Sequence, residues 1–72
     1  MSLRKIKEER KKKNLSQYEL ADIVSVTQGT IHQLETGIIK EPNVYLVLKI
    51  AMVFEKNATY FLDSEKLKIE LI

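Results

Sequence analysis

Apolar residues recur at helical spacing along most of the chain, and polar residues that favour helix ends divide this pattern into segments. Two of the segments, both within residues 15–37, are separated by only three or four residues. The first begins at Ser16, a capping residue, and Glu19 stands where it completes a capping box. The second begins at Thr27 and ends at Gly37, a common helix stop. Two helices so close must cross steeply, which presents the second one as a ridge on the surface.

The same spacing predicts which side chains of the two helices are buried. Leu20, Ala21 and Val24 form the apolar stripe of the first helix. Ile31 and Leu34, three residues apart, form the stripe of the second.

Periodicity predicts three more helices, and the chain is therefore expected to form an all-α, compact five-helix bundle. One helix should span residues 3–13 and bury Leu3 and Ile6. Another should begin after Pro42 and reach about Phe54, and a short last helix should span residues 59–62 after a turn at Asn57, where Asn tolerates positive φ. The stripe expected in the helix after Pro42 comprises Val44, Val47, Leu48, Ala51 and Phe54.

The helix after Pro42 is apolar nearly all round, because it carries further apolar residues outside this stripe. They are Tyr45, Leu46, Met52 and Val53. One small core cannot cover them all, so part of this helix is expected to meet a partner.

The last nine residues, 64–72, change to strand periodicity, because Leu67, Ile69 and Leu71 alternate with charged residues. A lone strand on a helical domain has nothing to pair with, which favours an antiparallel ribbon with a second chain in a twofold homodimer. A frayed tail and an extension of the last helix remain alternatives. We therefore divide the chain into a helical domain, residues 1–63, and a dimerisation tail, residues 64–72.

The surface of the helix after Thr27 is small or uncharged, whereas a face that serves only solubility usually carries Lys and Glu. Its residues are Gln28, Gly29, Thr30, His32, Gln33 and Thr36. Amides and hydroxyls suit base edges, and Gly allows a close approach of the backbone. The alternative is a polar exposed helix in an ordinary small bundle.

These residues resemble the helix-turn-helix of the Cro and lambdoid phage repressor family. The resemblance extends from Ile6 to Leu62. It is carried by Leu15-Ser16-Gln17, Glu19-Leu20-Ala21, Val26-Thr27, Thr30-Ile31, Gln33-Leu34-Glu35-Thr36-Gly37, Pro42, Leu48-Lys49-Ile50-Ala51 and Tyr60-Phe61-Leu62.

The resemblance implies roles for individual residues. Gln28 and Gln33 would read base edges in the major groove, and Thr27 and Thr30 would contact a phosphate or a thymine methyl. Gly29 departs from the family pattern, which often has a long polar side chain there, so closer backbone approach would replace one base contact. The residues expected at phosphates are Ser16, Gln17, Thr36 and Lys40, with His32 either at the DNA or simply on the surface.

Two structural consequences also follow from the resemblance. Arg10 and Glu35 are expected to form a buried ion pair, which would remove Arg10 from DNA contact. Ser25 stands where the family usually has Gly, so a residue with a Cβ is expected in a left-handed conformation there.

Composition excludes several other classes of protein. The chain has 72 residues, no Cys and one His, so we expect one small domain without a disulfide, metal centre or cofactor, and not an enzyme. No apolar run is long enough to span a bilayer and the N-terminus lacks the apolar core of a signal peptide, which predicts a cytoplasmic protein.

Charge is distributed unevenly, although the net charge is only +2. Seven basic and two acidic residues give residues 1–13 a charge of +5, while five basic and eight acidic residues give the remainder −3. A solvated lysine-rich helix would account for this run alone. Beside an uncharged reading helix, it is compatible with DNA.

The sequence therefore predicts a transcriptional regulator that binds double-stranded DNA at a near-palindromic operator as a homodimer, like a phage or prophage repressor or Cro. The alternative is a protein-interaction module of the same fold, such as an antitoxin or an anti-repressor-like protein that binds a partner protein.

Overall fold

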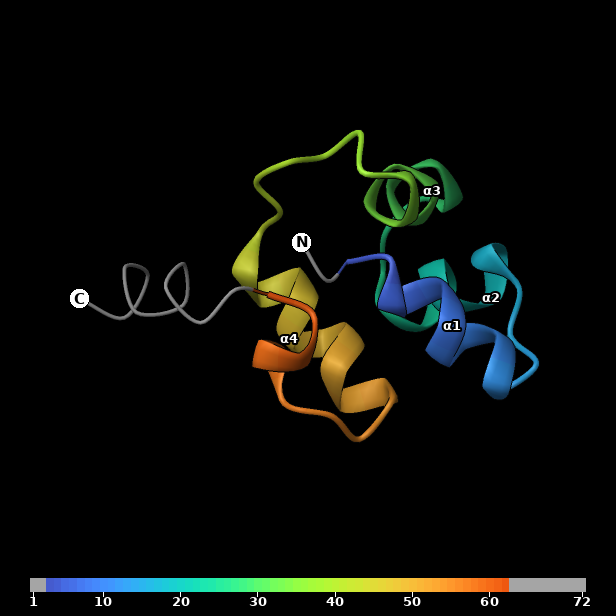
Figure 1. Cartoon of the computed structure of the whole chain (residues 1–72). Coiled ribbons are helices and arrows are strands. Elements are labelled where there is room, and N and C mark those ends of the chain that lie inside the picture. Colours follow the sequence, from blue (N-terminus) through green and yellow to red (C-terminus); the bar gives the residue numbers. More distant parts are fainter. Residues whose placement is uncertain (1–2, 63–72) are drawn as a thin grey trace.

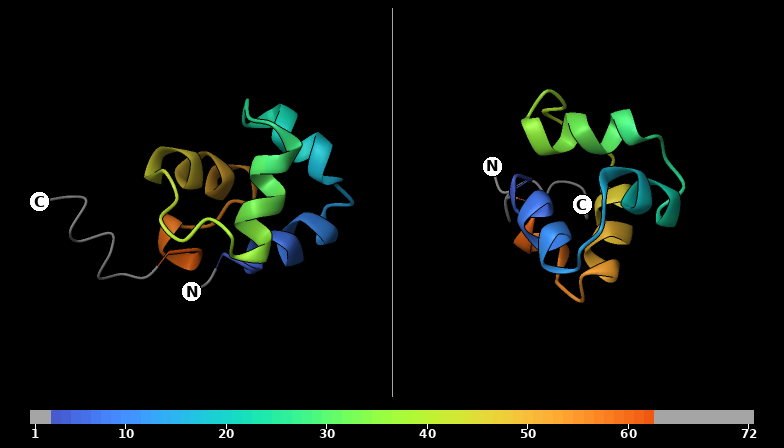
Figure 2. Two further views of the ribbon diagram at one scale, coloured as in Figure 1. Left: turned by 90° about the horizontal axis from the view of Figure 1, so that it is seen from above. Right: turned by 90° about the vertical axis from the view of Figure 1, so that its right-hand side faces the viewer.

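A computed structural model describes residues 3–62, which form four α-helices and one turn of 3₁₀ helix (Figure 1). The helices are α1 (Lys5–Lys12), α2 (Gln17–Ile23), α3 (Gln28–Thr36) and α4 (Val44–Val53), and the 3₁₀ turn is η1 (Ala58–Tyr60). Figure 1 looks almost along the axis of α3, while α1 runs across the same view beneath it. In the left view of Figure 2, α4 and η1 lie on the opposite side of the molecule from α2.

Within the described residues, the fifth helix expected over residues 59–62 is not formed as an α-helix. A single 3₁₀ turn, η1, stands in its place. Its hydrogen bonds join residues three apart, from Tyr60 N to Asn57 O and from Phe61 N to Ala58 O. The segment is too short for an α-helix to offset its costly first turn. Burial of Phe61 and Leu62, which are 0% and 2% exposed, holds it against the core instead. The strand expected in residues 64–72 lies outside the described residues.

The core combines side chains from all five elements. Leu3 and Ile6 are buried as expected, as are Leu20, Ala21, Val24, Ile31 and Leu34. In α4, the expected stripe is correct for Val47, Ala51 and Phe54. It is wrong for Leu48, which is 40% exposed, while Ile50 is fully buried. The buried arc of α4 follows the spacing 47, 50, 51 and 54, and Leu48 lies at its edge.

The helix ends follow the capping residues. Glu19 N donates to Ser16 Oγ at 3.0 Å and Ser16 N donates to Glu19 Oε1 at 2.8 Å, so the capping box is present. Thr27 caps α3 through a bond from Thr30 N, and Gly37 ends that helix in a left-handed conformation with φ 82°. Asn43, which the sequence analysis did not single out, caps α4 by accepting from Tyr45 N at 2.8 Å.

Within residues 3–62, three residues with a Cβ adopt positive φ, and all three follow a helix. Ser25 has φ 60°, as expected from its place in the turn between α2 and α3. Asn14 and Glu55 have φ 55° and 56°. The positive φ expected at Asn57 is wrong, since Asn57 is extended with φ −74°. The chain has already reversed at Glu55, directly after α4, so Asn57 only has to lead into η1.

The apolar surplus of α4 is smaller than the sequence suggested. Leu46 and Val53 are half-buried and pack against the core. Tyr45 and Met52 are each 77% exposed, and with Leu48 they are spaced three and four residues apart on one side of α4. We call these three residues the α4 apolar stripe. Within residues 3–62, no helix is long and apolar enough to cross a membrane.

The conformation of Ser25 predicts a stabilising substitution. The left-handed conformation costs a residue with a Cβ about 1–2 kcal/mol, and Gly avoids this cost. Gly also loses more conformational entropy on folding, which costs about 0.5–1 kcal/mol. Ser25→Gly should therefore raise the free energy of unfolding by up to about 1 kcal/mol in urea titrations. Asn14→Gly is the control and should gain less, because Asn tolerates this conformation. Equal gains at both positions would show that strain at Ser25 is not the cause.

Candidate nucleic-acid interface

The outer face of α3 is polar and carries no Lys, Arg, Asp or Glu side chain. Gly29, His32, Gln33 and Thr36 are exposed, and their spacing of three, four and seven residues places them on one side of the helix. The opposite side contributes Ile31 and Leu34 to the core. We call the exposed side, together with Gln28 at the start of the helix, the reading face.

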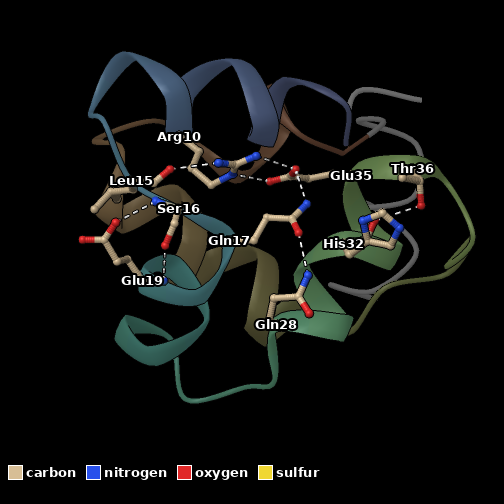
Figure 3. A network of polar contacts seen from close by, with 9 residues as sticks. All are labelled: Arg10, Leu15, Ser16, Gln17, Glu19, Gln28, His32, Glu35 and Thr36. Atoms are coloured by element: carbon tan, nitrogen blue, oxygen red, sulfur yellow. Dashed lines mark hydrogen bonds and ion pairs between the residues drawn. The ribbon is translucent and has the colours of Figure 1, made fainter.

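A chain of side-chain hydrogen bonds links the start of the reading face to α1 (Figure 3). Gln28 Nε2 donates to Gln17 Oε1 at 2.7 Å, and Gln17 Nε2 donates to Glu35 Oε1 at 3.0 Å. Glu35 in turn accepts two bonds from Arg10, whose Nη1 also donates to the carbonyl oxygen of Leu15 at 2.8 Å. The amide of Gln28 is thus connected through Gln17 and Glu35 to Arg10 in α1.

This network gives Gln17 a role that the sequence analysis did not assign. Its side chain was expected at a phosphate, but both ends of its amide are occupied by Glu35 and Gln28. It acts as a bridge between α2 and α3 that holds Gln28 in one orientation. Because Gln28 uses one amide N–H for Gln17, its Oε1 and its second N–H remain available to a ligand. The sequence shows two Gln residues at positions 17 and 28, but only the packing of α2 on α3 brings their amides together.

The Arg10–Glu35 ion pair is present and buried. Arg10 Nε and Nη2 donate to Glu35 Oε2 at 2.8 Å and Glu35 Oε1 at 3.0 Å. The side chains are only 10% and 1% exposed. Burial raises the pKa of Glu35, but hydrogen bonds from Arg10 and Gln17 outweigh burial, and the net pKa lies below its ordinary value of 4.5. The hydrogen bond to Glu35 likewise raises the pKa of Arg10. The pair keeps both charges and joins α1 to α3.

The hydroxyl groups around α3 are mostly engaged with the protein. Thr27 Oγ1 and Thr30 Oγ1 lie 3.0 Å apart in a hydrogen bond, and Thr36 Oγ1 donates to the carbonyl oxygen of His32 at 2.8 Å. Ser16 Oγ accepts from Glu19 N in the capping box. Hydroxyl oxygens have further acceptor capacity, so these bonds orient the groups without excluding a ligand.

Gly29 lies in open space on the reading face. A Cβ built there would have Thr27 Oγ1, at 3.9 Å, as its only neighbour within 4 Å. Packing therefore does not require Gly at this position. Its effect is to leave the backbone of α3 uncovered between Gln28 and Gln33, where a flat ligand surface could approach closely.

Lys40 is exposed in the loop between α3 and α4, beyond the end of the reading face (Figure 1). The expected tail residues Leu67, Ile69 and Leu71 lie outside the described residues. Within residues 3–62, no group of three or more His, Cys, Asp or Glu side chains is placed to hold a metal ion.

An exposed polar helix that is joined to a second helix by a short turn is the arrangement found in DNA-binding helix-turn-helix proteins. The family comparison agrees with this geometry, because a family model described as helix-turn-helix matches residues 6–61. The chain belongs to this family of DNA-binding transcription regulators, which are typically non-enzymatic. Comparison with curated proteins and with solved structures gave no match.

The lowered pKa of Glu35 predicts a loss of stability in acid. A carboxyl group with a lower pKa in the folded state stabilises the protein above its ordinary value of 4.5. This contribution is lost as the pH falls through the lower folded pKa. The pKa of Glu9 is also lowered, chiefly by its hydrogen bond from Lys12, so it contributes in the same range. The free energy of unfolding should therefore be constant near neutral pH and fall below about pH 4.5.

Urea titrations between pH 3 and pH 7 would measure this effect in the wild type and in two variants. Glu35→Gln should be less stable at pH 7, because Arg10 is left as a buried charge without its partner, a change that commonly costs about 3–5 kcal/mol. It should also lose less stability on acidification than the wild type. The exposed Glu8→Gln is the control and should retain the wild-type acid dependence. The same acid dependence in Glu35→Gln would contradict the role given to Glu35.

Proposed function

We propose that the chain is a sequence-specific regulator that reads double-stranded DNA in the major groove with α3, as a homodimer on a near-palindromic operator. The observation that carries this proposal is the reading face, a row of uncharged polar groups with its first amide held in place by the Arg10–Glu35–Gln17–Gln28 network. A phage or prophage repressor, or a Cro-like protein, is the kind of regulator that this arrangement resembles.

Base recognition in the proposal rests on two amides and on the surface between them. Gln28 presents an acceptor and a donor outward, the pair that matches N6 and N7 of adenine. Gln33 is exposed five residues further along α3, on the side of the helix that also carries Gly29 and Thr36. Gly29 permits close approach, and the methyl groups of Thr27 and Thr30 suit a thymine methyl.

Phosphate contacts in the proposal come from both ends of the reading face. At the start of α2, Gln17 has a backbone N–H that helix geometry leaves without a helical partner, and Ser16, whose own N–H is bonded to Glu19, offers its hydroxyl. Thr36, His32 and Lys40 lie towards the other end. Such contacts set the position of α3 on the duplex but add little sequence preference.

Dimerisation follows from the size of the reading face, because one helix in one groove reads too few base pairs to be selective. Two copies related by a twofold axis would place their α3 helices about 34–36 Å apart on one side of the duplex. The tail residues Leu67, Ile69 and Leu71 are the proposed contact.

A protein-interaction module of the same fold is the second candidate. The α4 apolar stripe favours it, since Tyr45 and Met52 are each 77% exposed on a helix separate from the reading face. In that case the stripe would bind a partner protein, as in an antitoxin.

Substitution of Gln33 tests the reading role. Gln33→Ala removes one amide from the reading face without touching the core, and a lost base contact costs about 1–3 kcal/mol. Selection of binding sites from random duplexes at fixed salt would first give the preferred operator. Gln33→Ala should then weaken binding to this operator about 5- to 150-fold while binding to random duplex changes little. Equal losses on both duplexes would refute base reading by Gln33. Lack of any preferred site in the wild type would favour the protein-interaction module.

Sedimentation of two full-length variants tests the dimer. Replacing Leu67, Ile69 and Leu71 together by Ser removes the apolar face of the tail, and this variant should sediment as a monomer and lose tight operator binding. Replacing Tyr45, Leu48 and Met52 together by Ser is the matched comparison and should leave the dimer intact. The reverse result would transfer the dimer contact to the α4 apolar stripe.

A further inference from the structure

Apart from Arg10, the basic side chains of α1 and its capping residue divide into two sets, and the first set, together with Lys56, is held against η1. Lys5 Nζ lies 4.5 Å from the centre of the Tyr60 ring, and Lys56 Nζ, from beyond α4, lies 5.1 Å from the same centre. Lys12 Nζ donates to Glu9 Oε2 at 3.1 Å, and the Tyr60 hydroxyl donates to the same oxygen at 3.1 Å. These three lysines therefore surround a tyrosine and a carboxylate, and part of their charge is compensated locally.

The second set consists of Arg4, Lys7 and Lys11, which we call the cationic stripe. They are spaced three and four residues apart, so they follow one side of α1 and the residue that caps it. All three are exposed, and within residues 3–62 none of their side chains takes part in a hydrogen bond or ion pair. Their charges are available to a partner.

Packing places the cationic stripe beside α3. Arg10, one turn beyond Lys7, reaches Glu35 of α3 and so turns this side of α1 towards the reading helix (Figure 3). Burial raises the pKa of Glu35, and the hydrogen bonds from Arg10 and Gln17 lower it. Lys7 is near enough for its charge to lower this pKa slightly further. Arg4 lines an open hollow of about 320 Å³ together with Thr36 and Gly37, at the end of α3. The stripe thus borders the reading face.

The surrounding charges leave the cationic stripe as a net positive edge. Glu35 compensates Arg10, and Glu9 is engaged by Lys12 and Tyr60. Glu8, the other acidic residue of α1, is four residues from Arg4 and three from Lys11, so it borders the cationic stripe and offsets part of its charge. A row of three positive charges beside an uncharged reading face matches the phosphate backbone at the rim of a major groove.

We propose that Arg4, Lys7 and Lys11 bind DNA phosphates that flank the bases read by α3. This inference rests on the proposed function. It adds a contact surface on α1, which the helix-turn-helix residues alone do not supply. The contacts would be independent of base sequence and would strengthen binding to every duplex.

Two charge-matched triple variants of the full chain test the proposal. The first replaces Arg4, Lys7 and Lys11 by Gln, and the second replaces Lys5, Lys12 and Lys56 by Gln. Both lower the net charge by three, and circular dichroism would check that both remain folded. The measurement is the dependence of the binding constant on salt concentration, with the selected operator and with a random-sequence duplex.

Each phosphate contact contributes about 0.9 to the salt slope, so the cationic-stripe variant should lose about two to three units on both duplexes. The control variant should keep a slope within about one unit of the wild type. Equal reductions of the slope in the two variants would overturn the proposal, because they would reflect net charge alone. An unchanged slope in the cationic-stripe variant would also overturn it. If the wild type binds neither duplex, the proposed function itself fails. If the wild type binds both duplexes and the cationic-stripe variant has an unchanged salt slope, the proposed function stands and this inference is wrong.

Discussion

The ion pair between Arg10 and Glu35 is the interaction on which the arrangement of this small protein depends. It lies between α1 and α3, is almost wholly buried, and satisfies its charges through bonds to each other, to Gln17 and to the carbonyl of Leu15. A buried pair adds little net stability compared with apolar side chains, but loss of one partner is costly because the other charge remains. The pair therefore constrains the relative position of α1 and α3 more than it adds stability. The fold is stable only when α1 and α3 meet at these two side chains.

The position of the reading face depends on this condition. Glu35 lies on the buried side of α3, and through Gln17 it is connected to the half-buried Gln28, two turns nearer the start of the same helix. Because every buried side-chain nitrogen and oxygen in the described residues has a partner, rotating one amide would leave another without its hydrogen bond. The network thus limits the orientations of Gln28 before any ligand arrives, which lowers the entropy cost of binding. The same contact turns one side of α1 towards α3, so a structural ion pair also determines where the free charges of α1 lie.

The charge of the chain illustrates why net values say little about a surface. Lys5, Lys12 and Lys56 gather around Tyr60 and Glu9, whereas Arg4, Lys7 and Lys11 have no such partners within residues 3–62. In the sequence, all of these residues except Lys56 belong to one basic run with Glu8 and Glu9 among them. Burial of Ile6 divides the run into two sides of a helix, where Glu9 lies on the side of Lys12 and Glu8 borders both sides.

Interactions between residues close together in the chain were sufficient to predict the helix ends, and the motif residues were sufficient to indicate a helix-turn-helix family. Ser16, Glu19, Thr27 and Gly37 act through groups a few residues away, so the ends of α2 and α3 could be derived from their spacing. The left-handed turn at Ser25 was expected from the family resemblance, because the family usually has Gly there. The stripes of α2 and α3 were also correct, because each contains few apolar residues and only one face can be buried.

Tertiary structure decided the remaining features. In α4 nearly every face is apolar, so only packing could choose Ile50 for the core and leave Leu48 at its edge. Burial of Phe61 and Leu62 determined that a 3₁₀ turn, and not an α-helix, follows α4. The reversal of the chain at Glu55 removed the need for positive φ at Asn57. The bridge from Gln17 to Gln28 and the separation of the α1 cations were likewise beyond the sequence. Both depend on side chains from different helices meeting in space, and helical spacing describes only the neighbours along one helix.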